Sequence, residues 1–248
     1  MAIETTGCEL ELFADAHAWK RYFADFLRPY IAGAVLEVGA GIGETTAVLC
    51  RDDLRAWTSV EPSPDLFARL QDRYRSLDGG CEAKAILGTV ADVPSDALFD
   101  TILYIDVLEH IEDDRAELVR AAGHLRPGGR IVTLSPAHDR LMSEFDRAIG
   151  HHRRYDRSMV SALTPSPLQL ERVAYLDSAG MALSLANRVF MRQSLPTKSQ
   201  IDVWSRYVVP VSKVIDRVTG FRFGKSIVAI WHMPAVERAL PQGTGGRP

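Results

Sequence analysis

An apolar strand that runs into a glycine-rich turn and then into a helix is the feature that most restricts the fold of this chain. Ala34–Val38 is a short apolar run, residues 39–43 (GAGIG) contribute three glycines, and Glu44–Cys50 has a helical pattern. Glycine permits a sharp turn and lets a ligand approach the backbone without a Cβ atom in the way. The segment therefore predicts the first unit of a parallel α/β sheet, with a candidate ligand site at the turn. A turn that binds nothing is the alternative.

The same alternation of strand and helix continues along the chain. Further strands are expected at Ala56–Glu61, Ala83–Leu87, Phe99–Ile105, Arg130–Leu134, Leu168–Leu176 and Ile227–Trp231, and helices at Asp65–Leu77 and Glu112–Leu125. This pattern predicts the α/β class, with a Rossmann-like, mostly parallel seven-stranded sheet and helices on both faces. Right-handed crossovers place the carboxyl ends of the parallel strands at one edge, where ligands of such sheets bind.

The length of 248 residues fits one domain. We predict a core of residues 31–177 and 223–233, preceded by an amphipathic N-terminal helix at residues 9–30. A helical lid insertion is expected at about residues 178–222. The two ends, residues 1–8 and about 240–248, are expected to be loose.

Composition excludes several classes of protein. With 29 basic and 32 acidic residues the formal net charge is −3, which argues against a surface made for nucleic acid. Cys8, Cys50 and Cys81 have no close pair in the sequence, so we expect neither a disulfide framework nor a zinc site, and a cytoplasmic location. The chain carries no apolar run of membrane-spanning length and no signal-peptide pattern.

Two acidic residues narrow the ligand at the glycine turn. Glu44 stands where a dinucleotide fold would have its third glycine, and its carboxylate would repel a pyrophosphate but not a sulfonium or ammonium group. Glu61 ends the second strand 20 residues after Gly41, where a carboxylate can accept hydrogen bonds from both hydroxyls of a ribose. A solvated strand end is the alternative interpretation of Glu61, and its spacing from the turn favours the ribose.

Five segments together resemble the class I S-adenosylmethionine-dependent methyltransferases, in particular a bacterial subgroup acting on small molecules. Residues 35–43 (VLEVGAGIG) resemble the glycine motif of that family, and residues 61–63 (EPS) resemble its ribose-binding acidic position. Residues 88–92 (GTVAD) resemble the segment beside the adenine, 99–111 (FDTILYIDVLEHI) the fourth-strand motif, and 125–129 (LRPGG) the turn before the fifth strand. The resemblance implies S-adenosylmethionine as the cofactor.

The resemblance also implies roles for individual residues. Glu37 would brace the glycine turn and reach the methionine ammonium, and Asp92 would face the adenine amino group. Arg21 could pair with the cofactor carboxylate, beside Trp19 and Tyr22, for which plain core packing is the alternative. The full set of expected cofactor-binding residues is Trp19, Arg21, Tyr22, Glu37, Gly39, Ala40, Gly41, Gly43, Glu61, Pro62, Ala91, Asp92, Asp106 and Val107.

Catalytic side chains are expected at the carboxyl edge of the sheet. His110 follows the fourth strand, and His151 and Tyr155 lie in residues 142–157, after the fifth. A histidine is a common base for a phenol or hydroxyl acceptor, so we predict His151, Tyr155 and His110 as catalytic residues. The alternatives are a packing role for His110 and a solvated polar loop whose arginines pair with nearby acids. We expect no metal, because the adjacent histidines do not share a face.

The lid insertion carries an apolar stripe at helical spacing. Its members are Trp204, Tyr207, Val208, Val211, Val214, Ile215 and Val218, with Arg206, Lys213, Asp216 and Arg217 opposite. We predict that the stripe packs on the core or within the lid; a dimer face and a membrane-surface helix are the weaker alternatives. Pro210 should kink or restart this helix.

These features predict an enzyme that moves a methyl group from S-adenosylmethionine to a small-molecule acceptor, at oxygen or nitrogen rather than carbon. The resembled subgroup suggests secondary-metabolite or polysaccharide assembly. A nicotinamide-dependent oxidoreductase and a catalytically silent cofactor-binding partner module are the alternatives. We expect a cytoplasmic monomer or homodimer whose partner is the small-molecule acceptor, with no nucleic acid and no membrane surface.

Overall fold

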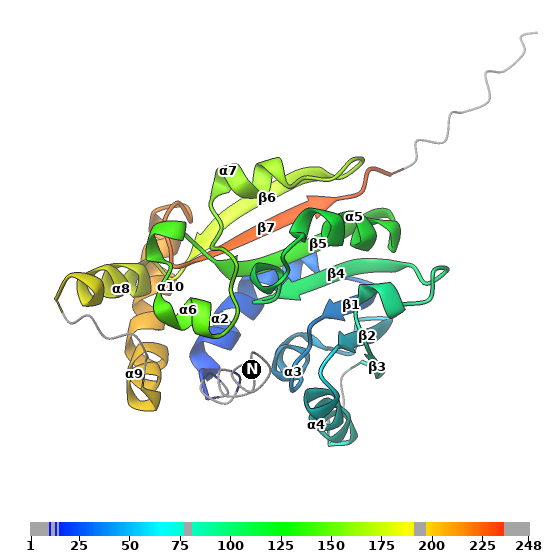
Figure 1. The fold of residues 1–248 in the computed structure, drawn as a ribbon, viewed down its shortest axis with the longest axis horizontal. Helices are drawn as coiled ribbons and strands as arrows, with labels where there is room; N and C mark the ends of the chain where they lie inside the picture. The colour runs from blue at the N-terminus through cyan, green and yellow to red at the C-terminus, as the bar shows by residue number, and fades with distance from the viewer. Residues whose placement is uncertain (1–9, 11–12, 14, 77–80, 191–196, 236–248) are drawn as a thin grey trace, which may run out of the picture.

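The computed structural model describes residues 10, 13, 15–76, 81–190 and 197–235. Cys8 and the loose ends expected at residues 1–8 and 240–248 lie outside these residues. One sheet runs through the molecule in the order β3-β2-β1-β4-β5-β7-β6 (Figure 1). Its strands are β1 (Ala34–Val38), β2 (Ala56–Glu61), β3 (Ala83–Leu87), β4 (Phe99–Ile105), β5 (Leu125–Pro136), β6 (Gln169–Leu176) and β7 (Ser226–His232).

The direction of the strands confirms the predicted α/β class. The pairs β2–β3, β1–β2, β1–β4 and β4–β5 are parallel, whereas β7 pairs antiparallel with both β5 and β6. The sheet is therefore mixed at one end and parallel elsewhere. The carboxyl ends of β1, β2, β4 and β5 share one edge, and β7 starts at that same edge.

Helices cover both faces of the sheet. They are α2 (His17–Leu27), α3 (Glu44–Leu49), α4 (Pro64–Arg75), α5 (Asp114–Gly123), α6 (Glu144–Ala148), α7 (Arg157–Ala162), α8 (Ser178–Phe190), α9 (Lys198–Val203) and α10 (Val209–Val218). A π-helix over Trp204–Val208 joins α9 to α10, and Pro210 lies in the first turn of α10. The helix was expected to kink or restart at Pro210, and α10 begins one residue before it, at Val209. In Figure 1 the lid helices α8, α9 and α10 stand together at the left, beside α6.

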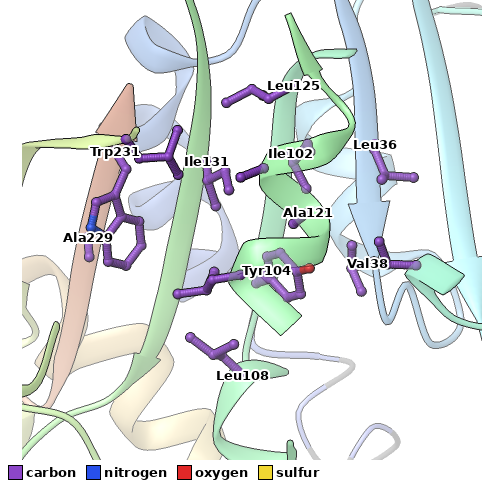
Figure 2. Close-up of a cluster of buried hydrophobic side chains, with 14 of the residues drawn as sticks. Leu36, Val38, Ile102, Tyr104, Leu108, Ala121, Leu125, Ile131, Ala229 and Trp231 are labelled. Atoms are coloured by element: carbon purple, nitrogen blue, oxygen red, sulfur yellow. The ribbon is translucent and has the colours of Figure 1, made fainter. Parts of the chain in front are cut away.

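Alternate residues of the central strands enter two separate hydrophobic cores, because a parallel sheet is buried on both faces. Ile102 packs in one core and its neighbour Leu103 in the other. Figure 2 shows Ile102, Ile131 and Trp231 of β4, β5 and β7 near Ala121 of α5, in the first of these cores. The second core joins the sheet to α2, α9 and α10. The lid and the N-terminal helix therefore pack on the same face.

Two expectations from the sequence are wrong. Cys50 and Cys81 form a disulfide bond, with Cα atoms 5.6 Å apart, although 31 positions separate them in the sequence. They meet because Cys50 follows α3 and Cys81 precedes β3, next to β2 in the sheet. The apolar stripe of the lid also differs from its prediction: Val214 and Val218 are 62% and 83% exposed, so these side chains do not pack inside.

Within the N-terminal helix expected at residues 9–30, α2 covers His17–Leu27, and residues 9, 11, 12 and 14 of that prediction lie outside the described residues. Among the residues that the structure describes, no helix has the length and apolar character needed to cross a membrane.

Candidate cofactor and acceptor site

The three glycines of the turn between β1 and α3 adopt the positive φ angles that glycine permits. Gly39, Gly41 and Gly43 have φ angles of 67°, 56° and 81°, a region that residues with a Cβ atom rarely adopt. A Cβ atom on Gly39 would lie 2.6 Å from Val107. The amide of Gly39 donates to the Val60 carbonyl at 2.9 Å, which fixes the turn to β2. The turn thus presents bare backbone beside the ends of β2 and β4.

Glu61 lies at the end of β2, against this turn, and is only 4% exposed. One carboxylate oxygen accepts from the Gly41 amide at 2.8 Å and the other from the Ser63 amide at 2.9 Å. Burial raises the pKa of Glu61, and these two backbone hydrogen bonds oppose that rise. An acceptor-only group is therefore held next to the backbone at the position where the sequence predicts ribose binding.

Glu37 braces the turn from behind. Its buried carboxylate accepts from Thr46 of α3, from Trp57 Nε1 at 2.8 Å and from Ser59 at 2.9 Å. Burial raises the pKa of Glu37, with these hydrogen bonds opposing the rise. The contacts support the predicted bracing role, and contact of Glu37 with the methionine ammonium stays a prediction.

The charge of Glu44 is neutralised by neighbouring cations, so the sequence-based argument that Glu44 would repel a pyrophosphate no longer holds. Its two carboxylate oxygens pair with Lys20 Nζ at 2.6 Å and with Arg73 at 2.9 Å. Because two cations neutralise Glu44, its charge no longer excludes a pyrophosphate from the turn.

The N-terminal helix α2 presents residues different from those expected. Lys20 faces the glycine turn, whereas Arg21 is exposed and the Tyr22 hydroxyl donates to Asp216 of α10 at 2.6 Å. Trp19 is buried against Trp204, with ring centroids 5.6 Å apart. Trp19 and Tyr22 thus have the packing role that was the alternative for both, and contact of Arg21 with the cofactor carboxylate stays a prediction.

The segment expected beside the adenine forms a short helical turn over Val90–Asp92. Asp92 accepts from the Thr89 amide at 2.8 Å and so caps its own turn. Asp92, Ala91 and Pro62 are all exposed. Contact of these three residues with an adenine stays a prediction.

Asp106 is the most unusual residue at the carboxyl edge. It follows β4 with a φ of 53°, a positive value that is uncommon outside glycine and often marks a functional position. Its side chain is exposed to solvent. Partial desolvation by the neighbouring protein atoms raises the pKa of Asp106 to about 6, while the charges of His151 and Arg154 oppose the rise. Asp106 can therefore exchange a proton near neutral pH.

His110 and His151 meet beside Asp106, with ring centroids 4.5 Å apart. His151 is 8% exposed and its Nδ1 lies 3.3 Å from Asp146. Burial, together with the neighbouring His151 and His152, lowers the pKa of His110 to about 4. Glu109, His110 and His151 each bring one possible ligand atom within 4.8 Å of the others, so the expected absence of a metal stays a prediction here.

The loop that carries His151 is held in place by buried ion pairs, so it is not the solvated polar loop of the alternative interpretation. Arg154 donates to both carboxylate oxygens of Asp146, at 2.7 and 2.9 Å. Burial alone would raise the pKa of Asp146, but hydrogen bonds from His151 and Arg154 hold it well below its usual range. The Tyr155 hydroxyl donates to Asp114 at 2.8 Å and to the Leu108 carbonyl at 3.1 Å, and Tyr155 is 1% exposed. This burial speaks against the predicted catalytic role of Tyr155.

Lys225 is a candidate that the sequence analysis missed. It directly precedes β7, and its ammonium lies 5.9 Å from the centre of the Trp204 ring. Burial lowers its pKa; the nearby Arg154 adds to that effect, whereas Asp177 and Asp146 oppose it. The only sequence signal was its position just before a strand that starts at the ligand-binding edge.

The structure also contains a cavity of about 370 Å³ away from this edge. Its lining includes Gly33, Asp100 and Gly129, at the amino ends of β1 and β4 and in the early part of β5. Because ligands of parallel sheets bind at the carboxyl ends, we do not place the candidate site there.

Comparison with known proteins agrees with the geometry. Residues 36–131, which run from β1 into β5, match a family model described as a methyltransferase domain. This stretch of the chain is therefore similar to a methyltransferase domain, and the fold of the whole is that of solved S-adenosylmethionine-dependent methyltransferases. A solved S-adenosylmethionine-dependent methyltransferase from Clostridium acetobutylicum shares this domain's fold, with a TM-score of 0.56 and 11% identity over 89% of this chain and 93% of that one. S-adenosylmethionine is the cofactor of the family.

Two curated bacterial relatives match this chain at low identity. A demethylmenaquinone methyltransferase of Tropheryma whipplei is 31% identical over 140 residues, 56% of each chain. A ubiquinone biosynthesis O-methyltransferase of Xylella fastidiosa is 32% identical over 105 residues, 42% of each chain. The chain thus spans about half the length of the curated relatives that it matches.

Proposed function

We propose that this protein transfers a methyl group from S-adenosylmethionine to an oxygen atom of a small-molecule acceptor. The observation that carries the proposal is the meeting of three features at one edge: the bare glycine turn, the buried Glu61 carboxylate and the solvent-reaching Asp106. The residue types fit the cofactor. Glu61 accepts hydrogen bonds as a ribose requires, and the turn leaves room for a close approach to the backbone.

Asp106 is the proposed base. Bound S-adenosylmethionine supplies a methyl group already activated by positive sulfur. As the acceptor oxygen forms its new bond to the methyl carbon and the carbon–sulfur bond breaks, Asp106 accepts the hydroxyl proton of the acceptor. A pKa of about 6 leaves most of this carboxylate unprotonated at neutral pH and still basic enough to take a proton. The chain's other contribution is positioning, which can lower the barrier by roughly 7–11 kcal/mol.

The name of one curated relative, an O-methyltransferase, favours oxygen as the acceptor atom. Lys225 and Trp204 are the proposed acceptor contacts, because a cation beside an indole ring suits a flat acceptor that carries a carbonyl or an anionic group. A role in secondary-metabolite or polysaccharide assembly stays a prediction from the sequence.

Calorimetry with S-adenosylhomocysteine and with NADH tests the cofactor assignment. We expect binding of S-adenosylhomocysteine alone, and at least a tenfold loss of affinity in Gly41→Val, because a side chain there would meet Leu10 in a region of positive φ. Binding of NADH alone would favour the oxidoreductase. Turnover against a panel of phenolic acceptors then separates an enzyme from a cofactor-binding module that is catalytically silent.

A further inference from the structure

The helical segment from α9 through α10 carries apolar residues on its outer face as well as on its inner face. Its buried positions include the polar residues Ser205, Ser212 and Asp216 beside Ile201 and Val209, whereas a separate row of apolar residues faces outward. We call Val203, Tyr207, Val211, Val214 and Val218 the outer stripe. Their spacing of four, four, three and four residues places them on one helical face.

Hydrogen bonds explain why these polar residues face inward. Asp216 accepts from the Tyr22 hydroxyl at 2.6 Å and from the Asp177 amide at 2.8 Å. Ser212 donates to the Asp177 carboxylate at 2.6 Å, and Ser205 accepts from the Ala18 amide at 3.3 Å. The lid is thereby fixed to α2 and to the end of β6, with its outer stripe left uncovered by the residues that the structure describes.

The exposed apolar surface is concentrated on the lid. The outer stripe is 51–83% exposed, and Phe223, just beyond α10, is 55% exposed. Outside residues 183–223, only Leu87, Leu98 and Val119 are large, apolar and exposed among the described residues. Such concentration marks an interaction surface rather than ordinary scattered exposure.

The charges beside the outer stripe indicate what kind of surface it binds. Residues 197–225 contain six cationic and two acidic residues, in a chain whose net charge is −3. Arg206, Arg217 and Arg222 are exposed, whereas Asp216 is buried. A cavity of about 440 Å³, lined by residues that include Val218, Arg222 and Phe223, adjoins the end of the stripe. An apolar face with cationic flanks suits an anionic lipid surface, whereas two copies paired through this face would bring like charges together.

We propose that the outer stripe binds to the surface of a membrane containing anionic phospholipid. The valines and Tyr207 insert among the upper acyl chains, and Arg206, Arg217 and Arg222 contact phosphate groups. The segment lies in the membrane plane. The proposal goes beyond methyl transfer and does not depend on it.

Vesicle co-flotation of the full chain tests the proposal. We expect binding to vesicles of phosphatidylcholine with phosphatidylglycerol, weak binding to phosphatidylcholine alone, and loss of binding at high salt. The double variant Val214→Asn/Val218→Asn should bind at least about tenfold more weakly, because two inserted side chains are lost. The variant Arg206→Gln/Arg217→Gln should bind about tenfold more weakly and show a smaller salt effect.

Val119→Asn is the matched control, since Val119 is 52% exposed on α5, outside the lid. This variant should bind vesicles like the unchanged protein, and circular dichroism should show all variants folded. Failure to float with anionic vesicles would overturn the proposal. So would a dimer in light scattering that Val214→Asn/Val218→Asn converts to a monomer, since a second copy would then cover the stripe.

Discussion

Asp106 combines two features at the scale of a single residue that seldom occur together without a function. Its backbone has a positive φ of 53°, and its pKa is raised to about 6. A residue in that region costs of order 1–3 kcal/mol, which the surrounding fold must offset. Asparagine tolerates the same backbone region and has nearly the same shape, so it separates the carboxylate's chemistry from its structural role.

Asp106→Asn should lower turnover by roughly 10²–10⁴-fold, the usual contribution of a positioned base, and leave affinity for S-adenosylhomocysteine within a few-fold. In the unchanged protein the deprotonated carboxylate is the active form. The rate kcat/KM should therefore rise with pH through about 6 and level off above it, and this rise should vanish in the variant.

Asp139→Asn is the control, because Asp139 is an exposed carboxylate that follows β5 at the same edge. It should leave both the turnover and the pH profile unchanged. A pH profile that persists in Asp106→Asn would assign the proton transfer to another group, with His151, whose charge acts on Asp106, the next candidate.

At the scale of elements, the segment between β5 and α7 is fixed by buried polar contacts. Tyr155 binds Asp114 and Leu108, and Arg154 binds Asp146. These contacts attach the segment to the turn after β4, so it holds His151 beside Asp106 without depending on apolar burial alone.

Tyr155→Phe should reduce the free energy of unfolding by about 1–2 kcal/mol, because it removes two buried hydrogen bonds. Urea denaturation measures this loss, and Tyr207→Phe, at an exposed tyrosine of the lid, is the matched control. Unchanged stability together with lost turnover would instead support the catalytic role that the sequence suggested for Tyr155.

The order of the elements was predictable because a sheet buried on both faces needs continuous apolar strands, such as Ile102–Tyr104, separated by helices. The rotation of α2 about its axis was not predictable: the sequence pointed to Arg21 as the cation near the cofactor, and in the structure its neighbour Lys20 is the one that pairs with Glu44 at the glycine turn. Which face of α10 packs inward was also hidden, since the pattern defines two faces but not the partners. Those partners, Tyr22 and Asp177, are distant in sequence.

Across the whole molecule, one covalent link joins parts that are distant in the sequence. The Cys50–Cys81 disulfide connects the end of α3 to the start of β3 and closes a loop over 31 positions. The two cysteines are far apart in the sequence, so their spacing alone does not predict that they pair.

Cys50→Ser/Cys81→Ser should lower the free energy of unfolding by about 2–4 kcal/mol, because the unfolded chain gains freedom when the loop opens. Denaturant unfolding without reductant measures the change. Reduction of the unchanged protein should reproduce it, and Cys8→Ser should have no effect. Equal midpoints for oxidised and reduced protein would show that the link does not contribute to stability.

Because the lid is held by Asp216, Ser212 and Ser205 on its inner side, its outer valines contribute little to folding. This surface can therefore be redesigned independently of the rest of the chain. Polar replacements there should yield a preparation that needs no detergent, and new lattice contacts could be engineered at these positions without altering the cofactor-binding edge.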